Sequence, residues 1–202
     1  MLRRALLLSA LAASLATPTL AQDAAAPAPA LPRVQMETSA GRIVIEVETA
    51  KAPITAANFL KYVDERRFDG ATFYRAMQSG PGTGLVQGGV NNDPERVLPP
   101  IAHEPTTQTG LSHLDGAVSM ARYAPGTATG DFFVSVGPTL SYDAGRSFSV
   151  DPDGFAVFGR VVQGMEVVRA ILAAPTSPTE GEGFMRGQML EPRIVILQAW
   201  RE

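Results

Sequence analysis

The chain of 202 residues contains no cysteine, two histidines and one tryptophan. Without cysteine it can form no disulfide, and it offers no thiol for lipid attachment after the N-terminal apolar stretch. Two histidines without a thiolate do not indicate a structural metal site, so we expect neither a metal nor a cofactor. Basic residues number 17 against 20 acidic ones. This balance lacks the electrostatic signature of a nucleic-acid partner or of a membrane-surface protein.

Long apolar runs are also scarce, and the clearest one lies at the N-terminus. Arg3 and Arg4 precede an apolar stretch over residues 5–15, and Thr19-Leu20-Ala21 has the pattern of a cleavage site. The run is too short and wrongly flanked for a membrane-spanning helix. We predict a signal peptide over residues 1–21 and no membrane anchor after its cleavage; a retained N-terminal anchor is the alternative. A periplasmic or secreted location follows from this prediction.

The remaining chain is expected to hold one folded domain. Residues 22–32 are rich in Ala and Pro and are typical of a flexible linker. Residues 33–202 suit one domain with one core, and they contain no internal repeat that we can find. We expect this domain to be monomeric.

Periodicity predicts mainly β structure with two helices. Apolar and polar residues alternate over residues 34–38, and a second, mostly apolar strand is predicted over 43–47; the turn residues between the two indicate a hairpin. Helical spacing begins at Pro53, and a second helix is predicted over Met165–Leu172. Further short strands are predicted around 71–74, 85–87, 117–121, 132–136, 156–161 and 193–200. Such a pattern favours a closed barrel, although the residues alone do not choose its topology.

Three long loops separate these strands, over residues 90–116, 137–154 and 174–192. Loops of this length in a compact domain are usually functional or disordered. The middle loop lies between two of the motifs described next, so we expect it to form one wall of a groove. The last loop is rich in Gly, Pro and Thr, and we expect a mobile connection there.

Five sequence blocks occur in one order along the domain: Phe73-Tyr74-Arg75, Gln87-Gly88-Gly89, Ser119–Arg122, Asp131–Val134 and Val157–Val161. Together they resemble the cyclophilin family of peptidyl-prolyl cis-trans isomerases, over a region from about Val34 to Trp200. The resemblance implies a closed eight-stranded antiparallel barrel capped by two α-helices, with the substrate in an external groove. It also implies an isomerase that assists the folding of exported proteins and acts on proline-containing unfolded or extended polypeptides.

Arg75 matches the catalytic arginine of the family. A guanidinium stays charged and presents several donors in one plane, which suits stabilisation of a twisted amide. Spacing alone favours an arginine paired with a nearby acid, and it is the surrounding blocks that favour the catalytic role. The resemblance further implies seven substrate-binding positions, which are Leu85, Gln87, Ala121, Arg122, Asp131, Phe133 and Phe155. Phe132, the neighbour of Phe133, points to the other face of its strand, where we expect the core.

The chain departs from the family pattern at several positions. The segment Ala76–Gly84 is several residues longer than usual, and Gly84 stands where the family commonly has a pocket phenylalanine. Asp131 replaces a glutamine, and Phe155 replaces a histidine found in many members. We expect the Asp131 carboxylate to pair with Arg122 in preference to Arg75, since an unpaired charge in a partly apolar groove is unfavourable. The missing phenylalanine leaves a second hypothesis open, a module or holdase that binds proline segments without catalysis.

Other motifs in the sequence are weaker. Residues 80–84 are glycine-rich, but no Gly-Lys-Ser/Thr follows them, so a phosphate loop is not indicated. Ser112-His113 with Asp115 contains the residue types of a catalytic triad, although neighbours on one loop rarely align. His103-Glu104 could bind a metal only weakly, and we expect Glu104 to hold the loop backbone instead.

Overall fold

A computed structural model describes residues 30–202 and places Leu31–Glu202 in one compact unit. The predicted signal peptide over residues 1–21, and the linker up to residue 29, lie outside the described residues. None of the helices within residues 30–202 is both long and apolar enough to cross a membrane.

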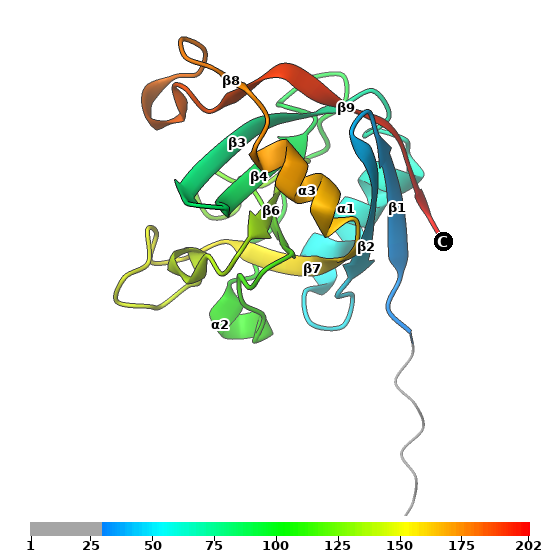
Figure 1. The fold of residues 1–202 in the computed structure, drawn as a ribbon. Coiled ribbons are helices and arrows are strands. Elements are labelled where there is room, and N and C mark those ends of the chain that lie inside the picture. Colours follow the sequence, from blue (N-terminus) through cyan, green and yellow to red (C-terminus); the bar gives the residue numbers. More distant parts are fainter. Residues whose placement is uncertain (1–29) are drawn as a thin grey trace, which may run out of the picture. The chain divides into compact units, whose positions relative to one another are not determined.

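The unit is built on a closed antiparallel barrel (Figure 1). Its eight strands follow the order β1-β2-β7-β5-β6-β4-β3-β9, and β9 pairs back with β1. A two-residue strand, β8, pairs with β9 outside this ring. The strands are β1 (Arg33–Thr38), β2 (Gly41–Val47), β3 (Thr72–Gly80), β4 (Thr83–Gly89), β5 (Ala117–Met120), β6 (Phe132–Val136), β7 (Ala156–Gln163), β8 (Thr176–Ser177) and β9 (Met189–Arg201). The predicted fold class is therefore confirmed.

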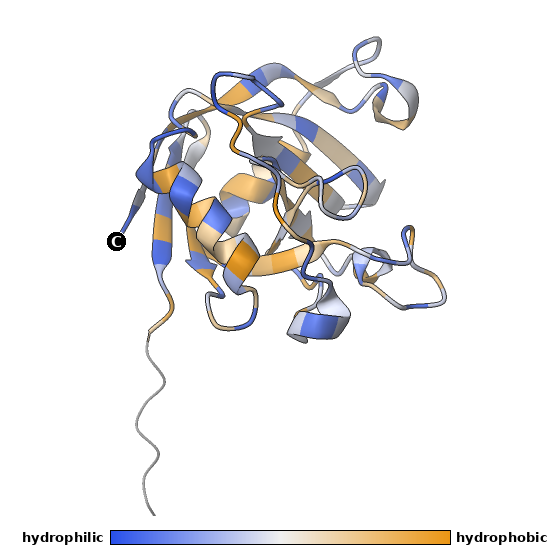
Figure 2. Ribbon diagram, turned by 180° about the vertical axis from the view of Figure 1, so that it is seen from behind, coloured by the Kyte–Doolittle hydropathy of each residue, from blue (hydrophilic) through white to orange (hydrophobic). Residues whose placement is uncertain are grey.

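Two longer helices and one short helix accompany the barrel. Helix α3 (Met165–Leu172) lies in front of the strands and α1 (Pro53–Asp64) behind them in Figure 1, while α2 (Thr106–Thr109) is a single turn. The prediction counted two helices and missed α2, because four residues carry no helical periodicity. Hydrophobic and hydrophilic residues alternate along α1 in Figure 2, and the apolar side chains of Phe59, Leu60 and Val63 are buried.

The start of α1 depends on a buried acid from a distant loop. Glu104 is 1% exposed. Its carboxylate accepts hydrogen bonds from the backbone N–H groups of Ile54 and Thr55, at 3.2 and 2.8 Å, and from the Thr55 hydroxyl. A carboxylate at this position satisfies N–H groups that have no partner within the helix. The predicted role of Glu104 in holding backbone is confirmed.

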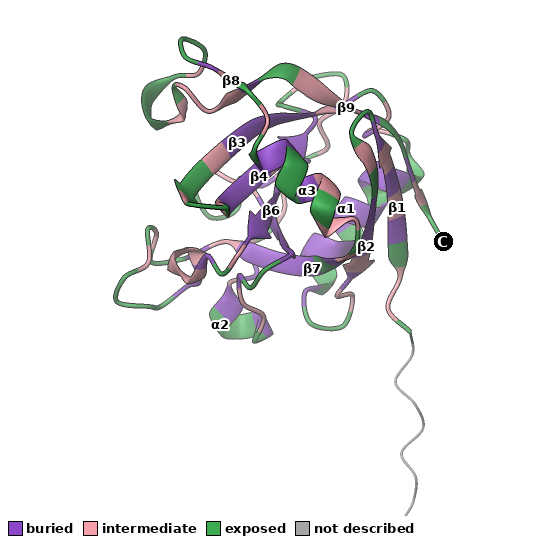
Figure 3. Ribbon diagram, in the orientation of Figure 1, coloured by how far each residue is buried: buried purple, intermediate pink, exposed green. Residues whose placement is uncertain are grey.

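The core fills the barrel interior with aromatic and aliphatic side chains. Phe132 is fully buried and meets the rings of Phe59, Phe68 and Phe73 edge-on, at centroid distances of 5.5–5.7 Å. Strands β4, β6 and β7 are buried along most of their length (Figure 3). Packing of this kind fixes the barrel wall, and the opposite face of the same strands is then available for a site.

The glycine-rich segment Ala76–Gly84 is not an irregular link. It extends β3 and β4 into a long hairpin, in which Met77 lies opposite Leu85 and Gln78 opposite Gly84. Gly84 has a φ of +152°, and a Cβ there would lie 2.0 Å from the Met77 carbonyl oxygen. Position 84 therefore excludes any side chain, and the family's phenylalanine could not be accommodated without rebuilding the hairpin.

Candidate active site

A cavity of about 280 Å³ opens on the outer face of the barrel wall. Its lining includes all eight residues predicted for the site, which are Arg75, Leu85, Gln87, Ala121, Arg122, Asp131, Phe133 and Phe155. Six of them come from four separate sequence blocks, while Leu85 and Phe155 each lie two residues before a block, and the barrel brings all eight together.

Strand register explains why these side chains converge. Arg75 lies directly opposite Gln87 in the β3–β4 pair, Gln87 opposite Phe133 in β4–β6, and Phe133 opposite Ser119 in β6–β5. On the other side of β3, Arg75 lies opposite Met189 of β9. Residues directly opposite each other in antiparallel strands share a face. The five residues therefore form one row across five strands, with Arg75 between the apolar Met189 and the amide of Gln87.

Arg75 is 9% exposed and is held by two amide oxygens. Its Nη1 donates to Gln87 Oε1 at 2.9 Å, and its Nε donates to Gln188 Oε1 at 2.8 Å. Gln87 is fixed in turn, because its Nε2 donates to the Tyr74 hydroxyl at 2.7 Å. Burial lowers the pKa of Arg75 from its ordinary value, but an arginine remains protonated at any physiological pH. No acid lies within ion-pair distance of Arg75 among the described residues, so its charge is not neutralised.

Phe133 forms the apolar floor of the cavity. It is 3% exposed, and its ring contacts those of Tyr142 and Phe155 at centroid distances of 5.6 and 5.5 Å. Behind it the His113 imidazole stacks nearly parallel, at 5.7 Å and 7°. The predicted division of labour is confirmed: Phe132 faces the core and Phe133 faces the cavity.

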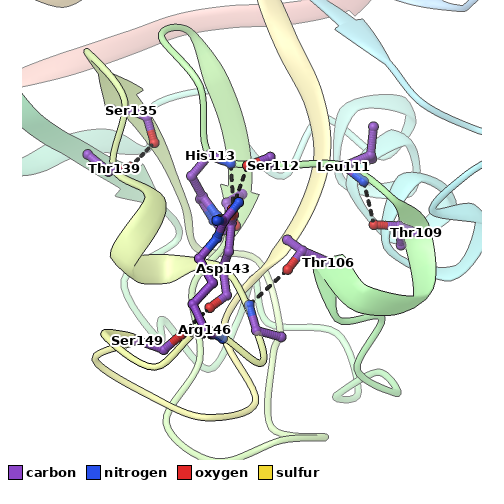
Figure 4. A network of polar contacts seen from close by, with 12 residues as sticks. Thr106, Thr109, Leu111, Ser112, His113, Ser135, Thr139, Asp143, Arg146 and Ser149 are labelled. Carbon is purple, nitrogen blue, oxygen red and sulfur yellow. Dashed lines mark hydrogen bonds and ion pairs between the residues drawn. The ribbon is translucent and has the colours of Figure 1, made fainter.

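A buried polar network holds His113 in place (Figure 4). Its Nδ1 lies 2.7 Å from Asp143 Oδ1, and its Nε2 lies 2.9 Å from Ser119 Oγ. Ser112 and Arg146 contact the second oxygen of Asp143. Burial lowers the pKa of His113, against the opposing effect of Asp143, so the neutral ring donates to Asp143 and accepts from Ser119.

This network has the residue types of a hydrolase triad but not the exposure. His113 and Ser119 are both 0% exposed, so no substrate reaches the serine hydroxyl. The acid is Asp143; Asp115, the neighbour considered in the sequence, instead binds Gly137 N and Arg169. The network supports Phe133 from behind and carries no chemistry of its own.

Asp131 does not pair with an arginine, so that prediction is wrong. Its Oδ1 accepts the backbone N–H of Asn91, two residues after the end of β4, at 2.7 Å. Asn91 has a φ of 51°, a left-handed conformation that this hydrogen bond supports. Burial raises the pKa of Asp131, while the bonds from Asn91 and Tyr74 act to lower it. The carboxylate therefore binds the loop backbone, whereas the sequence pattern predicted an arginine as its partner.

Arg122 is occupied by the loop on its own side of the cavity. It forms an ion pair with Asp151 at 3.0 Å and donates to the Gly154 carbonyl oxygen. Its guanidinium also lies 5.0 Å from the centroid of the Phe155 ring. The loop 137–154 thus packs against the site as predicted, and Tyr142 is the residue through which it lines the cavity.

Sequence reasoning missed the contribution of residues 174–192. This loop was expected to be a mobile connection, yet Phe184, Met185 and Met189 line the cavity and Gln188 binds Arg75. Its apolar residues within a Gly-rich loop were the one available signal. No cluster of three or more His, Asp or Glu side chains suited to a metal ion occurs within residues 30–202.

Comparison with known proteins agrees with this geometry. Residues 33–198 match the family model for "Cyclophilin type peptidyl-prolyl cis-trans isomerase/CLD". The chain belongs to the cyclophilin family. A peptidyl-prolyl cis-trans isomerase of Acinetobacter baylyi is 36% identical over 148 residues, covering 71% of this chain and 73% of that protein. The isomerase cyp18 of Streptomyces antibioticus is 37% identical over 152 residues, covering 73% and 87%.

A cyclophilin-type isomerase of Cryptosporidium parvum, crystallised in the presence of the dipeptide Ala-Pro, has the same fold. Its TM-score is 0.67 at 17% identity, with 84% of this chain and 98% of that chain covered. The cyclophilin family is an isomerase family, so the predictions of family and enzyme class are confirmed.

Proposed function

We propose that this cyclophilin accelerates rotation about X–Pro bonds in exposed, extended segments of exported proteins while they fold. The observation that carries the proposal is Arg75, a charged guanidinium fixed by two amide oxygens beside an apolar floor. A fixed donor and an apolar seat for a proline ring are the two elements that this reaction requires.

The chemistry needs no nucleophile, metal or cofactor. Amide resonance produces a rotational barrier of about 18–20 kcal/mol. As the bond twists, the proline nitrogen becomes pyramidal and regains its lone pair, which a well-placed N–H donor stabilises. Arg75 Nη2 makes no hydrogen bond to any residue of the part that the structure describes, while Nε and Nη1 do. The guanidinium is thus preorganised with Nη2 left for the substrate, as electrostatic catalysis requires.

The cavity suits a small apolar group with few polar contacts around it. Phe133 and Leu85 offer carbon surface, and Gln87 contributes an amide to the lining. Sites for small ligands commonly combine an apolar lining with a few fixed polar groups. The neighbour crystallised with Ala-Pro and the names of the bacterial relatives support a proline-containing peptide as the substrate.

The cellular setting is part of the proposal. We propose that residues 1–21 direct export, that no membrane anchor remains after cleavage, and that the mature protein works as a monomer in the periplasm or outside the cell. The positively charged start, the apolar run and the small-residue cleavage site support this.

The test is a protease-coupled isomerisation assay on short X–Pro peptides, together with refolding of a protein whose slow phase is limited by proline. We expect acceleration of both by the wild type and loss of both in Arg75→Ala. If the wild type binds the peptides but accelerates neither reaction, the chain is a binding module and the proposed activity is wrong.

A further inference from the structure

The loop between β8 and β9 lies against the catalytic arginine. Residues 178–188, called the C-terminal loop here, leave the sheet at β8 and return to it at β9, which pairs with β8 through Thr176–Leu190 and Ser177–Met189. The loop is the excursion above β3 in Figure 1. It carries a single 3₁₀ turn over Gly183–Met185. These two residue pairs join the two ends of the loop, which holds the loop close to the site.

Gln188 couples this loop to Arg75 through both ends of its amide. Its Oε1 accepts from Arg75 Nε at 2.8 Å, and its Nε2 donates to the Phe184 carbonyl oxygen at 2.8 Å. With Gln87 on the other side, the guanidinium is held from two directions by residues 101 positions apart in sequence (188 − 87). Without Gln188 the arginine would retain one side-chain acceptor and could rotate about its terminal torsions.

Phe184 stands over the same guanidinium. Its ring centroid lies 5.5 Å from Arg75 Cζ, within cation–π range, although 78% of the residue is exposed. Together with Met185 and Met189 it lines the cavity. An exposed phenylalanine in a loop contributes little to the stability of the fold. Its position in the lining of the cavity therefore points to a role in binding.

The β3–β4 hairpin cannot supply an apolar side chain to the cavity from position 84. Gly84 on β4 excludes any side chain, because a Cβ would meet the Met77 carbonyl oxygen at 2.0 Å. The cavity crosses the sheet in the strand order β5, β6, β4, β3, β9. Ala121, which follows β5, and the C-terminal loop, which precedes β9, therefore lie at opposite ends of the cavity.

We propose that the C-terminal loop is a working part of the isomerase site. Gln188 is a positioning residue for Arg75, and Phe184 with Met185 forms an apolar wall that contacts the side chain of the residue after proline. In this arrangement the chain before the proline runs toward Ala121, and the chain after the proline runs toward the loop. The wall selects large apolar side chains at that position. This inference rests on the proposed function, which assigns the cavity to an X–Pro segment.

The chain offers matched controls for both residues. Phe148 is 58% exposed and lies over Arg146 at 5.8 Å, a similar aromatic–arginine contact that does not line the cavity. Gln78 donates its amide to the Leu172 carbonyl oxygen at 3.2 Å, also away from the cavity lining. Phe148→Ala and Gln78→Met therefore reproduce the chemical change without touching the site.

The experiment compares Ala-Pro-Phe and Ala-Pro-Gly peptides, with kcat and KM determined separately by NMR exchange and thermal melts recorded for each variant. Gln188→Met should lower kcat about fivefold, as expected for one lost hydrogen bond, with KM within twofold of wild type. Phe184→Ala should raise KM about fivefold for the Phe peptide and leave the Gly peptide unchanged. Phe148→Ala and Gln78→Met should change neither constant.

Unchanged kcat in Gln188→Met would overturn the positioning role, and equal effects of Phe184→Ala on both peptides would overturn the wall. If the wild type proves inactive, the proposed function is wrong, and the role of Phe184 in the wall is then tested by peptide affinity alone. In that case weaker binding of the Phe peptide to Phe184→Ala, but not to Phe148→Ala, supports it, and equal affinities overturn it. Gln188→Leu is the second variant if Gln188→Met does not fold.

Discussion

The adjacent phenylalanines of β6 provide a stringent test of how the barrel divides core from site. Phe132→Ala removes a fully buried ring that meets three other rings edge-on. A Phe→Ala change in a core typically costs about 3–5 kcal/mol of unfolding free energy. Phe133→Ala removes a ring with one face toward an open cavity, so water can fill the space that is left. Its cost should be nearer the transfer term, about 1.5–3 kcal/mol.

Urea or guanidinium unfolding measures both changes, with the activity assay run on the same samples. We expect Phe132→Ala to be the less stable variant by about 1–2 kcal/mol, or roughly 2–8 °C in melting temperature for a domain of this size. Phe133→Ala should be the less active variant, with a raised KM for proline peptides. If Phe133→Ala were the less stable variant, or if it bound peptide normally, the assignment of the two faces would be refuted.

Three further outcomes follow from the same structure. Burial raises the pKa of Asp131, so its ionised form lowers the stability of the folded protein at neutral pH. Asp131→Asn can still accept the hydrogen bond from Asn91 and should therefore stabilise the protein at neutral pH. This gain in stability should shrink as the pH falls through the raised pKa of Asp131. If Asp131→Asn were less stable than the wild type at neutral pH, this reasoning would be wrong. Burial lowers the pKa of His113, so the unfolded chain binds the proton more readily and stability should fall as the pH drops below about 6.5. His113→Gln should flatten that slope in denaturation series at several pH values, and an unchanged slope would mean that the imidazole is not the titrating group. Mature protein isolated from its host should begin near Gln22 by mass spectrometry, and a chain beginning at Met1 would contradict export.

Local patterns predicted much of the fold because they depend on residues close in sequence. Helix α3 and strand β6 have the predicted bounds, Met165–Leu172 and Phe132–Val136, since apolar spacing is strong in both. The hairpin extension of β3 and β4 was missed, because a run containing several glycines reads as a loop. The helical turn α2 was missed because it is too short to show a period.

The sequence predicted which residues belong to the site, but not all of the contacts that they make. The cavity gathers Arg75, Gln87 and Phe133 because their strands pair in register, and the family blocks encode that register. The partner of Asp131 could not be predicted, because a backbone N–H has no signature in sequence. Gln188 was missed for a related reason: its contact with Arg75 spans 113 residues and depends on how a loop folds back.

The most direct test is NMR exchange spectroscopy of an Ala-Pro peptide with catalytic amounts of the purified protein. Uncatalysed X–Pro bonds exchange in tens to hundreds of seconds, too slowly for cross peaks between the cis and trans signals. We predict cross peaks with the wild type and a rate about 10²–10³ lower in Arg75→Ala, as for the loss of one transition-state donor. Arg75→Lys should recover only part of this rate, because an ammonium cannot contact both amide oxygens in one plane. Exchange that is equally fast with wild type and Arg75→Ala would contradict the account.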